Sequence, residues 1–211
     1  IKQAVAEVEK CAWVCEYYAQ NAQTQLAPKT ITTDATESYV SYEPLGVVLA
    51  VMPWNYPFWQ VFRFIAPALM AGNVGVLKHA SNVMRCAENI EQAILNAGFP
   101  EGCFQTLLVS HDQIETIIGD DVVKAVSLTG SEGAGRKIAE IAGKNLKKVV
   151  LELGGNNAII IMDDADIDMV IRGTLFGAVG TAGQRCTSTR RLIIHEDIYD
   201  KVKDAVVKAY G

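Results

Sequence analysis

From Leu45 onward the sequence alternates short apolar segments of strand character with segments of helical spacing. Parallel strands need a crossover connection, usually a helix, so this alternation predicts an α/β fold with a doubly wound, mostly parallel sheet. Such sheets bind ligands beyond the carboxyl ends of their strands. The strand candidates are GVVLAVMP, NVGVLKH, FQTLLVS, AVSLTG, KVVLELGG, AIIIM and RLIIH, and the helix candidates are WQVFRFIAPALMAG, NVMRCAENIEQAILNAG and EGAGRKIAEIAGK. Gly72 and Gly98 stand where helix C-caps are expected.

Two segments precede this alternation. In residues 1–27 apolar side chains recur three and four positions apart, opposite a polar face, which predicts a helix of several turns. After Pro28 the stretch TITTDATESYVSYEPLG is rich in Thr, Tyr and Val with near alternation, which favours an extended strand reaching toward Pro44. No segment of linker composition separates this stretch from the first apolar strand candidate.

Charge and hydropathy exclude several classes of function. With 19 Lys and Arg residues against 24 Asp and Glu, the formal net charge is -5, so nucleic acid and anionic membranes are not expected partners. The longest apolar run, Leu45 to Met52, is far shorter than the ~20 residues of a membrane-spanning helix. No signal-peptide pattern opens the chain, which begins on Ile and ends on KAYG. We expect an interior piece of a cytoplasmic protein.

The five cysteines form an odd set without C-x-x-C spacing, which favours a reducing compartment and predicts no metal site. Cys11 and Cys15 share one helix face, and both are expected to be buried apolar thiols. Cys186 differs because its neighbours are polar or cationic. A thiol beside cations and exposed amides forms its thiolate readily, which makes Cys186 either a nucleophile or an inert thiol in an unusual setting.

Other polar residues stand at the ends of predicted strands. The turn TGSEGAG places Gly130 and Ser131 where backbone N–H groups can meet a phosphate, although a glycine-rich packing turn explains it equally well. Lys78 in KHAS is placed for a ribose or phosphate, or is a solvated lysine. Glu152 in LELGG is a general base in apolar surroundings, or the partner of a buried Arg or Lys. Asn55 in PWNYP is an oxyanion donor held between two prolines, or a turn residue.

Together and in this order, these motifs resemble the aldehyde dehydrogenase superfamily. PWNYP, LKHAS, TGSEGAG, LELGG and GQRC follow one another in family order between Leu45 and His195. The resemblance implies a Rossmann-like NAD(P)-binding domain in residues 45–152, with its helical part in 1–29 and a protruding oligomerisation arm in 30–44. Residues 153–211 are then the start of a second, α/β catalytic domain, the remainder of which is missing.

The resemblance also assigns roles to residues. Cys186 attacks the aldehyde carbon to form a thiohemiacetal, hydride transfer to the nicotinamide leaves a thioester, and Glu152 activates the water that hydrolyses it. The side-chain amide of Asn55 and the backbone N–H of Cys186 stabilise the oxyanion. The implied nucleotide contacts are Trp54, Lys78, His79, Ala80, Ser81, Gly130, Ser131 and Leu153.

The substrate implied is a small aldehyde that carries a carboxylate, such as succinic semialdehyde. Up to LELGG the sequence resembles bacterial succinate-semialdehyde dehydrogenases, and after it NNAII and GTAGQRCTSTRRLIIHE resemble the α-aminoadipic semialdehyde branch. Family members continue with an E-x-F-G-P segment and a final oligomerisation strand that are not matched here. We therefore expect a homodimer or homotetramer only of the complete protein. The alternative is a non-catalytic nucleotide-binding fragment or a structural member of the superfamily.

The sequence predicts that NADP is accepted and slightly favoured over NAD. Many NAD-preferring family members carry an acidic residue three places after the strand lysine, where this chain has Ser81. Without that carboxylate a 2′-phosphate is not repelled, and Lys78 remains available to pair with it. Calorimetric titration of the chain with NADP and NAD side by side tests this, and tenfold tighter binding of NAD would contradict it.

Overall fold

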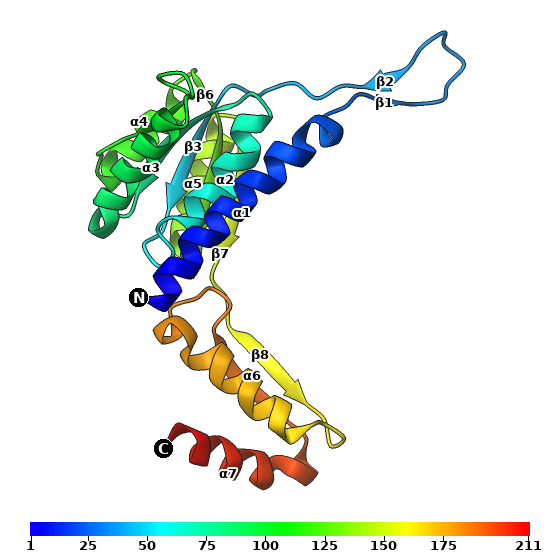
Figure 1. The fold of residues 1–211 in the computed structure, drawn as a ribbon, viewed down its shortest axis with the longest axis vertical. Coiled ribbons are helices and arrows are strands. Elements are labelled where there is room, and N and C mark those ends of the chain that lie inside the picture. The colour runs from blue at the N-terminus through cyan, green and yellow to red at the C-terminus, as the bar shows by residue number, and fades with distance from the viewer. The chain divides into compact units, whose positions relative to one another are not determined.

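The computed structural model describes residues 1–211, which divide into two compact units, Ile1–Leu153 and Gly154–Gly211 (Figure 1). The first contains α1 (Lys2–Gln25), β1 (Lys29–Thr30), β2 (Tyr39–Val40), β3 (Val47–Met52), α2 (Trp59–Met70), β4 (Val74–His79), α3 (Met84–Asn96), β5 (Phe104–Thr106), α4 (Ile114–Gly119), β6 (Val123–Gly130), α5 (Glu132–Lys144) and β7 (Lys148–Leu153). The second contains β8 (Asn157–Ile161), α6 (Ile167–Val179), β9 (Thr189–Ile194) and α7 (Tyr199–Tyr210). None of these helices has the length and apolar content needed to cross a membrane.

The first unit is built on a five-stranded parallel sheet in the order β5-β4-β3-β6-β7. The chain runs outward from β3 through β4 to β5, then returns to the other side of β3 as β6. The strand order therefore reverses between β3 and β6, which is the switch point where doubly wound sheets bind ligands. The predicted fold class, a mixed α/β chain on a mostly parallel sheet, is confirmed.

The strands direct apolar side chains alternately to the two faces of this sheet, so helices pack on both faces. On one side, Leu49, Val126 and Leu128 pack with α4 and α5, and we call this the α5 face. On the other, Met52 and Leu77 pack with α2 and α3, and we call this the α2 face. Each face has its own buried cluster.

Helix α1 packs along α2 and supplies the cap that α2 lacks (Figure 1). The Glu7 carboxylate oxygen Oε1 accepts the backbone N–H groups of Phe58 and Trp59, each at 2.8 Å. The Lys10 ammonium lies 3.9 Å from the centroid of the Trp59 ring. Because the first N–H groups of a helix have no partner within it, this carboxylate satisfies two of them and fixes where α2 begins.

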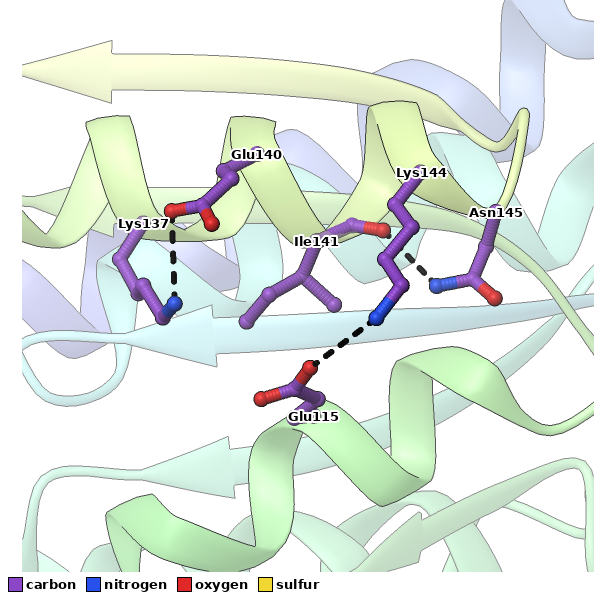
Figure 2. Close-up of polar contacts among 6 residues, drawn as sticks. All are labelled: Glu115, Lys137, Glu140, Ile141, Lys144 and Asn145. Atoms are coloured by element: carbon purple, nitrogen blue, oxygen red, sulfur yellow. Dashed lines mark hydrogen bonds and ion pairs between the residues drawn. The ribbon is translucent and has the colours of Figure 1, made fainter.

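The α4–α5 corner combines surface ion pairs with an apolar anchor (Figure 2). Lys144 pairs with Glu115 of α4 at 3.9 Å, and the Asn145 side-chain amide donates to the Ile141 carbonyl at 2.8 Å. Exposed pairs of this kind contribute about 0–1 kcal/mol each. The buried Ile141 side chain beneath them therefore holds the corner more strongly.

Some expectations are corrected. Residues 30–44 form no single strand: β1 and β2 pair antiparallel as a short hairpin, because Thr33 and Ser38 bond across its bend, Oγ1 to Oγ at 2.6 Å. The strand predicted at FQTLLVS ends at Thr106. The prediction of two buried thiols holds for Cys11, whose pKa burial and the Glu7 carboxylate raise to about 12, and is wrong for the exposed Cys15.

Two glycines of α5 form a matched pair for a stability test. A Cβ at Gly135 would lie 2.6 Å from Cδ2 of Leu153, whereas one at Gly133 would meet nothing within 4 Å. Gly135→Ala should lower the free energy of unfolding by about 1–3 kcal/mol through overpacking. Gly133→Ala should be neutral or stabilising by up to about 1 kcal/mol. Urea unfolding of both variants measures this, and equal effects would contradict it.

Candidate active site

The predicted site residues of the first unit follow four neighbouring strands at one edge of the sheet. Residue Met52 at the end of β3 pairs in register with His79 at the end of β4, and Gly130 at the end of β6 pairs with Leu153 at the end of β7. The parallel direction of the strands brings these ends to one edge. The residues that follow or close the strands are Trp54, Asn55, Lys78, His79, Ala80, Ser81, Gly130, Ser131, Glu152 and Leu153.

The pleat divides neighbouring residues at this edge between the two faces. Val76 and Leu77 pack with the α5-face and α2-face clusters respectively. Lys78 therefore continues the α5 face, and His79 continues the α2 face. In the same way Leu153 packs with the α5-face cluster, while Glu152 lines a groove beside α2. Two chemically different surfaces meet at the edge.

The α5-face part of the edge carries positive charge. The side chain of Lys78 is 3% exposed, and no carboxylate of the chain forms an ion pair with it. Burial lowers the pKa of this ammonium. The Ser131 Oγ caps α5 by accepting the Ala134 N–H at 3.2 Å, next to the open backbone at Gly133. A buried cation and a helix N-terminus suit an anionic group such as a phosphate.

The α2-face part of the edge carries the carboxylate. Glu152 Oε2 lies 3.7 Å from the Arg63 guanidinium, which also donates to Thr129 Oγ1 at 3.1 Å. Of the two interpretations of Glu152, pairing with an arginine agrees with this contact, although Arg63 is not buried, whereas apolar surroundings do not, since the Glu152 side chain is 56% exposed. Strand β7 is the outermost strand of the sheet, and its α2 face borders an open groove of about 470 Å³. The buried Gln60 also lines this groove, and its Oε1 accepts no hydrogen bond.

The loop from Pro53 to Pro57 holds Asn55 half-buried and leaves Trp54 exposed. After this loop the chain continues into α2, where the Phe58 and Trp59 N–H groups donate to the Glu7 carboxylate. The loop is thus anchored to β3 at one end and to α1 at the other.

Cys186 belongs to the second unit and is exposed between a short helical turn, Gly180–Gly183, and β9. Thr181 at φ 55° and Ala182 at φ 52° adopt the left-handed conformation, which is costly for residues with a Cβ and most of all for β-branched Thr. The guanidinium of Arg185, the expected cationic neighbour, lies over the Phe176 ring at 4.8 Å.

Several residues that hold the site were missed by the sequence analysis. Asn157 donates from Nδ2 to the Cys186 carbonyl at 2.7 Å and to the Ser188 carbonyl at 3.2 Å. Arg63 contacts Glu152, and Glu7 binds the backbone at the start of α2. Their partners lie far away in sequence, so no local spacing could have identified them.

Comparison with known proteins gives consistent results along the whole chain. A model described as the aldehyde dehydrogenase family matches residues 1–211. The probable succinate-semialdehyde dehydrogenase [NADP(+)] of Synechocystis sp. is 50% identical over 210 residues, covering 100% of this chain and 46% of that protein. The succinate-semialdehyde dehydrogenase [NADP(+)] of Mycobacterium avium is 51% identical over 211 residues, covering 99% of this chain and 45% of that protein.

Solved structures agree with these relatives. The succinic semialdehyde dehydrogenase of Streptococcus pyogenes, solved in complex with NADP+, superposes with a TM-score of 0.94 at 44% identity, covering 97% of this chain and 45% of that one. This chain thus spans less than half the length of the relatives that it matches.

Replacing the buried cation of the α5 face tests its electrostatic cost. Because burial lowers the pKa of Lys78 below its ordinary 10.5, burying the charged form destabilises the fold at neutral pH. Lys78→Met should raise the unfolding midpoint at pH 7. The stability difference should shrink as the pH rises through the lowered pKa of the folded state toward the ordinary 10.5, because the buried lysine loses its proton in that range. Thermal unfolding at several pH values checks this, and a pH-independent difference would contradict it.

Proposed function

Because the chain belongs to the aldehyde dehydrogenase family, we propose that it forms the nucleotide-binding part and carries the nucleophile of an NADP-dependent enzyme. The enzyme oxidises a carboxylate-bearing aldehyde, such as succinic semialdehyde, to the acid. The observation that carries this proposal is the gathering of Asn55, Lys78 and Glu152 at one sheet edge, in a chain half identical to succinate-semialdehyde dehydrogenases. A non-catalytic or purely structural role finds no support among those relatives.

The residues of the α5 face fit NADP. Lys78 is a buried cation without a carboxylate partner, and Ser81, three residues later, introduces no negative charge. The N-terminus of α5 behind Gly130 and Ser131 offers backbone N–H groups to phosphate oxygens. When bound, NADP would accept a hydride. The names of the Synechocystis and Mycobacterium relatives, which specify NADP(+), support this choice.

The chain's own residues perform the remaining chemistry. The Cys186 thiolate forms a C–S bond to the aldehyde carbon, and the carbonyl electron pair moves to oxygen. The Asn55 amide and the Cys186 N–H donate to that oxyanion. After oxidation to the thioester, Glu152 takes a proton from the attacking water, and the C–S bond breaks to release the acid and the thiolate. The Arg63 guanidinium, 3.7 Å from Glu152 Oε2, helps to hold this carboxylate in place.

The remaining parts of the chain complete the proposal. Residues 45–152 serve as the NAD(P)-binding domain with 1–29 as its helical part, and 153–211 begin the catalytic domain. The arm, residues 30–44, presents exposed Tyr39, Val40 and Tyr42 for assembly of a cytoplasmic homodimer or homotetramer.

NADPH formation from succinic semialdehyde tests the mechanism in this chain and in any longer polypeptide that contains it. Wherever turnover is found, Cys186→Ala should reduce it by at least ~10³-fold, because the covalent intermediate is lost. Glu152→Gln should retain one rapid turnover of NADPH formation and then slow by about 10²–10⁴-fold, because only hydrolysis needs the base. Cys15→Ala, which also removes an exposed thiol, is the control. Full activity of Cys186→Ala would refute the proposed nucleophile.

A further inference from the structure

We propose that His79 is a positioning residue, whose imidazole ties the loop carrying Asn55 to the strand end carrying Lys78. The inference rests on the proposed function, because it concerns the geometry of that site. It changes the role expected for His79 from the family resemblance, in which the residue is a nucleotide contact. In this inference the ring acts on the protein backbone.

The hydrogen bonds of the ring define its tautomer. The Ala80 N–H donates to Nδ1 of His79 at 2.9 Å, which requires a lone pair on Nδ1, whereas a bond to the Met52 carbonyl at 3.2 Å would require a proton there. The shorter contact favours the lone pair on Nδ1. The proton therefore resides on Nε2, which donates to the Pro57 carbonyl at 2.9 Å. The ring is 1% exposed, and the Met52 carbonyl lies 3.2 Å from Nδ1. One imidazole thus contacts the end of β3, the far end of the loop and the residue after β4.

The position of His79 in the strand separates its ring from the nucleotide side. Lys78 and His79 are consecutive residues of β4, so their side chains point to opposite faces of the sheet. Lys78 continues the α5 face, where Ser131 caps α5. His79 continues the α2 face, where its Nε2 reaches Pro57, two residues before the start of α2. The ring is therefore directed toward the loop that carries the oxyanion donor.

With the bond to Pro57, the backbone of three consecutive residues is held by side chains from other elements. His79 holds the Pro57 carbonyl, and Glu7 holds the N–H groups of Phe58 and Trp59. On the other side of Asn55 the chain is fixed by β3, whose last residue is Met52. Asn55 thus lies in a short loop held at both ends. Loss of the Nε2 donor would leave the half-buried Pro57 carbonyl unsatisfied and free one end of that loop.

Two isosteric substitutions distinguish the roles of the two ring nitrogens. The amide nitrogen of Gln reaches the place of Nε2, whereas that of Asn reaches only the place of Nδ1. His79→Gln therefore keeps the donor to Pro57, and His79→Asn loses it. His111→Gln, at an exposed histidine on a short helical turn, is the matched control.

The readouts are amide hydrogen exchange of Tyr56, Phe58 and Trp59, NADP affinity by calorimetry, and the ¹⁵N signature of the imidazole tautomer. We expect the Nε2–H tautomer in the wild-type chain, exchange about tenfold faster or more in His79→Asn, and near wild-type exchange in His79→Gln. NADP affinity should change less than about threefold in both variants, because a positioning residue does not touch the nucleotide.

Three results would overturn the inference. These are an Nδ1–H or doubly protonated ring, loop exchange in His79→Asn equal to that of the control, and an equal loss of NADP affinity in both variants with the loop unchanged. The tautomer measurement needs no variant and decides the question even if a variant fails to fold. Absence of NADP binding to the wild-type chain would instead overturn the proposed function alone, since the loop exchange and the tautomer do not depend on it.

Discussion

The pleat of parallel strands that end at one edge determines where each polar side chain of the candidate site points. Consecutive residues of a strand face opposite sides, so Lys78 and His79 are adjacent in sequence and separated by the sheet. The same alternation sends Leu153 to the cluster with α5 and Glu152 to the groove beside α2. A shift of one residue in register would exchange these roles. The site therefore depends on the register of β3, β4, β6 and β7.

Contacts from distant segments then fix the loops that leave this edge. The Glu7 carboxylate of α1 reaches the first turn of α2, 51 and 52 positions along the chain, and the His79 ring reaches Pro57, 22 positions back. Each bond satisfies a backbone group that the local structure leaves without a partner. The loop carrying Asn55 thereby gains order from two elements that carry no catalytic group. Positioning of this kind holds a loop residue with the accuracy that a binding or catalytic site requires.

The second unit uses the same principle around Cys186, the proposed nucleophile. Cys186 lies outside regular structure, and the Asn157 side chain at the start of β8 holds its carbonyl. The left-handed residues Thr181 and Ala182 precede it, at a place where strain is tolerated because neighbouring contacts compensate for it. Arg185 is turned onto Phe176. The polar sequence around Cys186 therefore serves partly to shape the loop.

The sequence by itself determined the α/β class, the helices at α1, α2, α3 and α5, and the family motifs, because these follow from local periodicity and from motif order. It did not predict α4, α6 or α7, and it read the arm as one strand. Only the tertiary structure decided that Glu152 is exposed beside Arg63, that Cys15 is exposed, and that the His79 ring bonds the backbone. These properties depend on which segments pack together across long separations. Local spacing carries no information about such contacts, whereas the packed sheet and its register specify them.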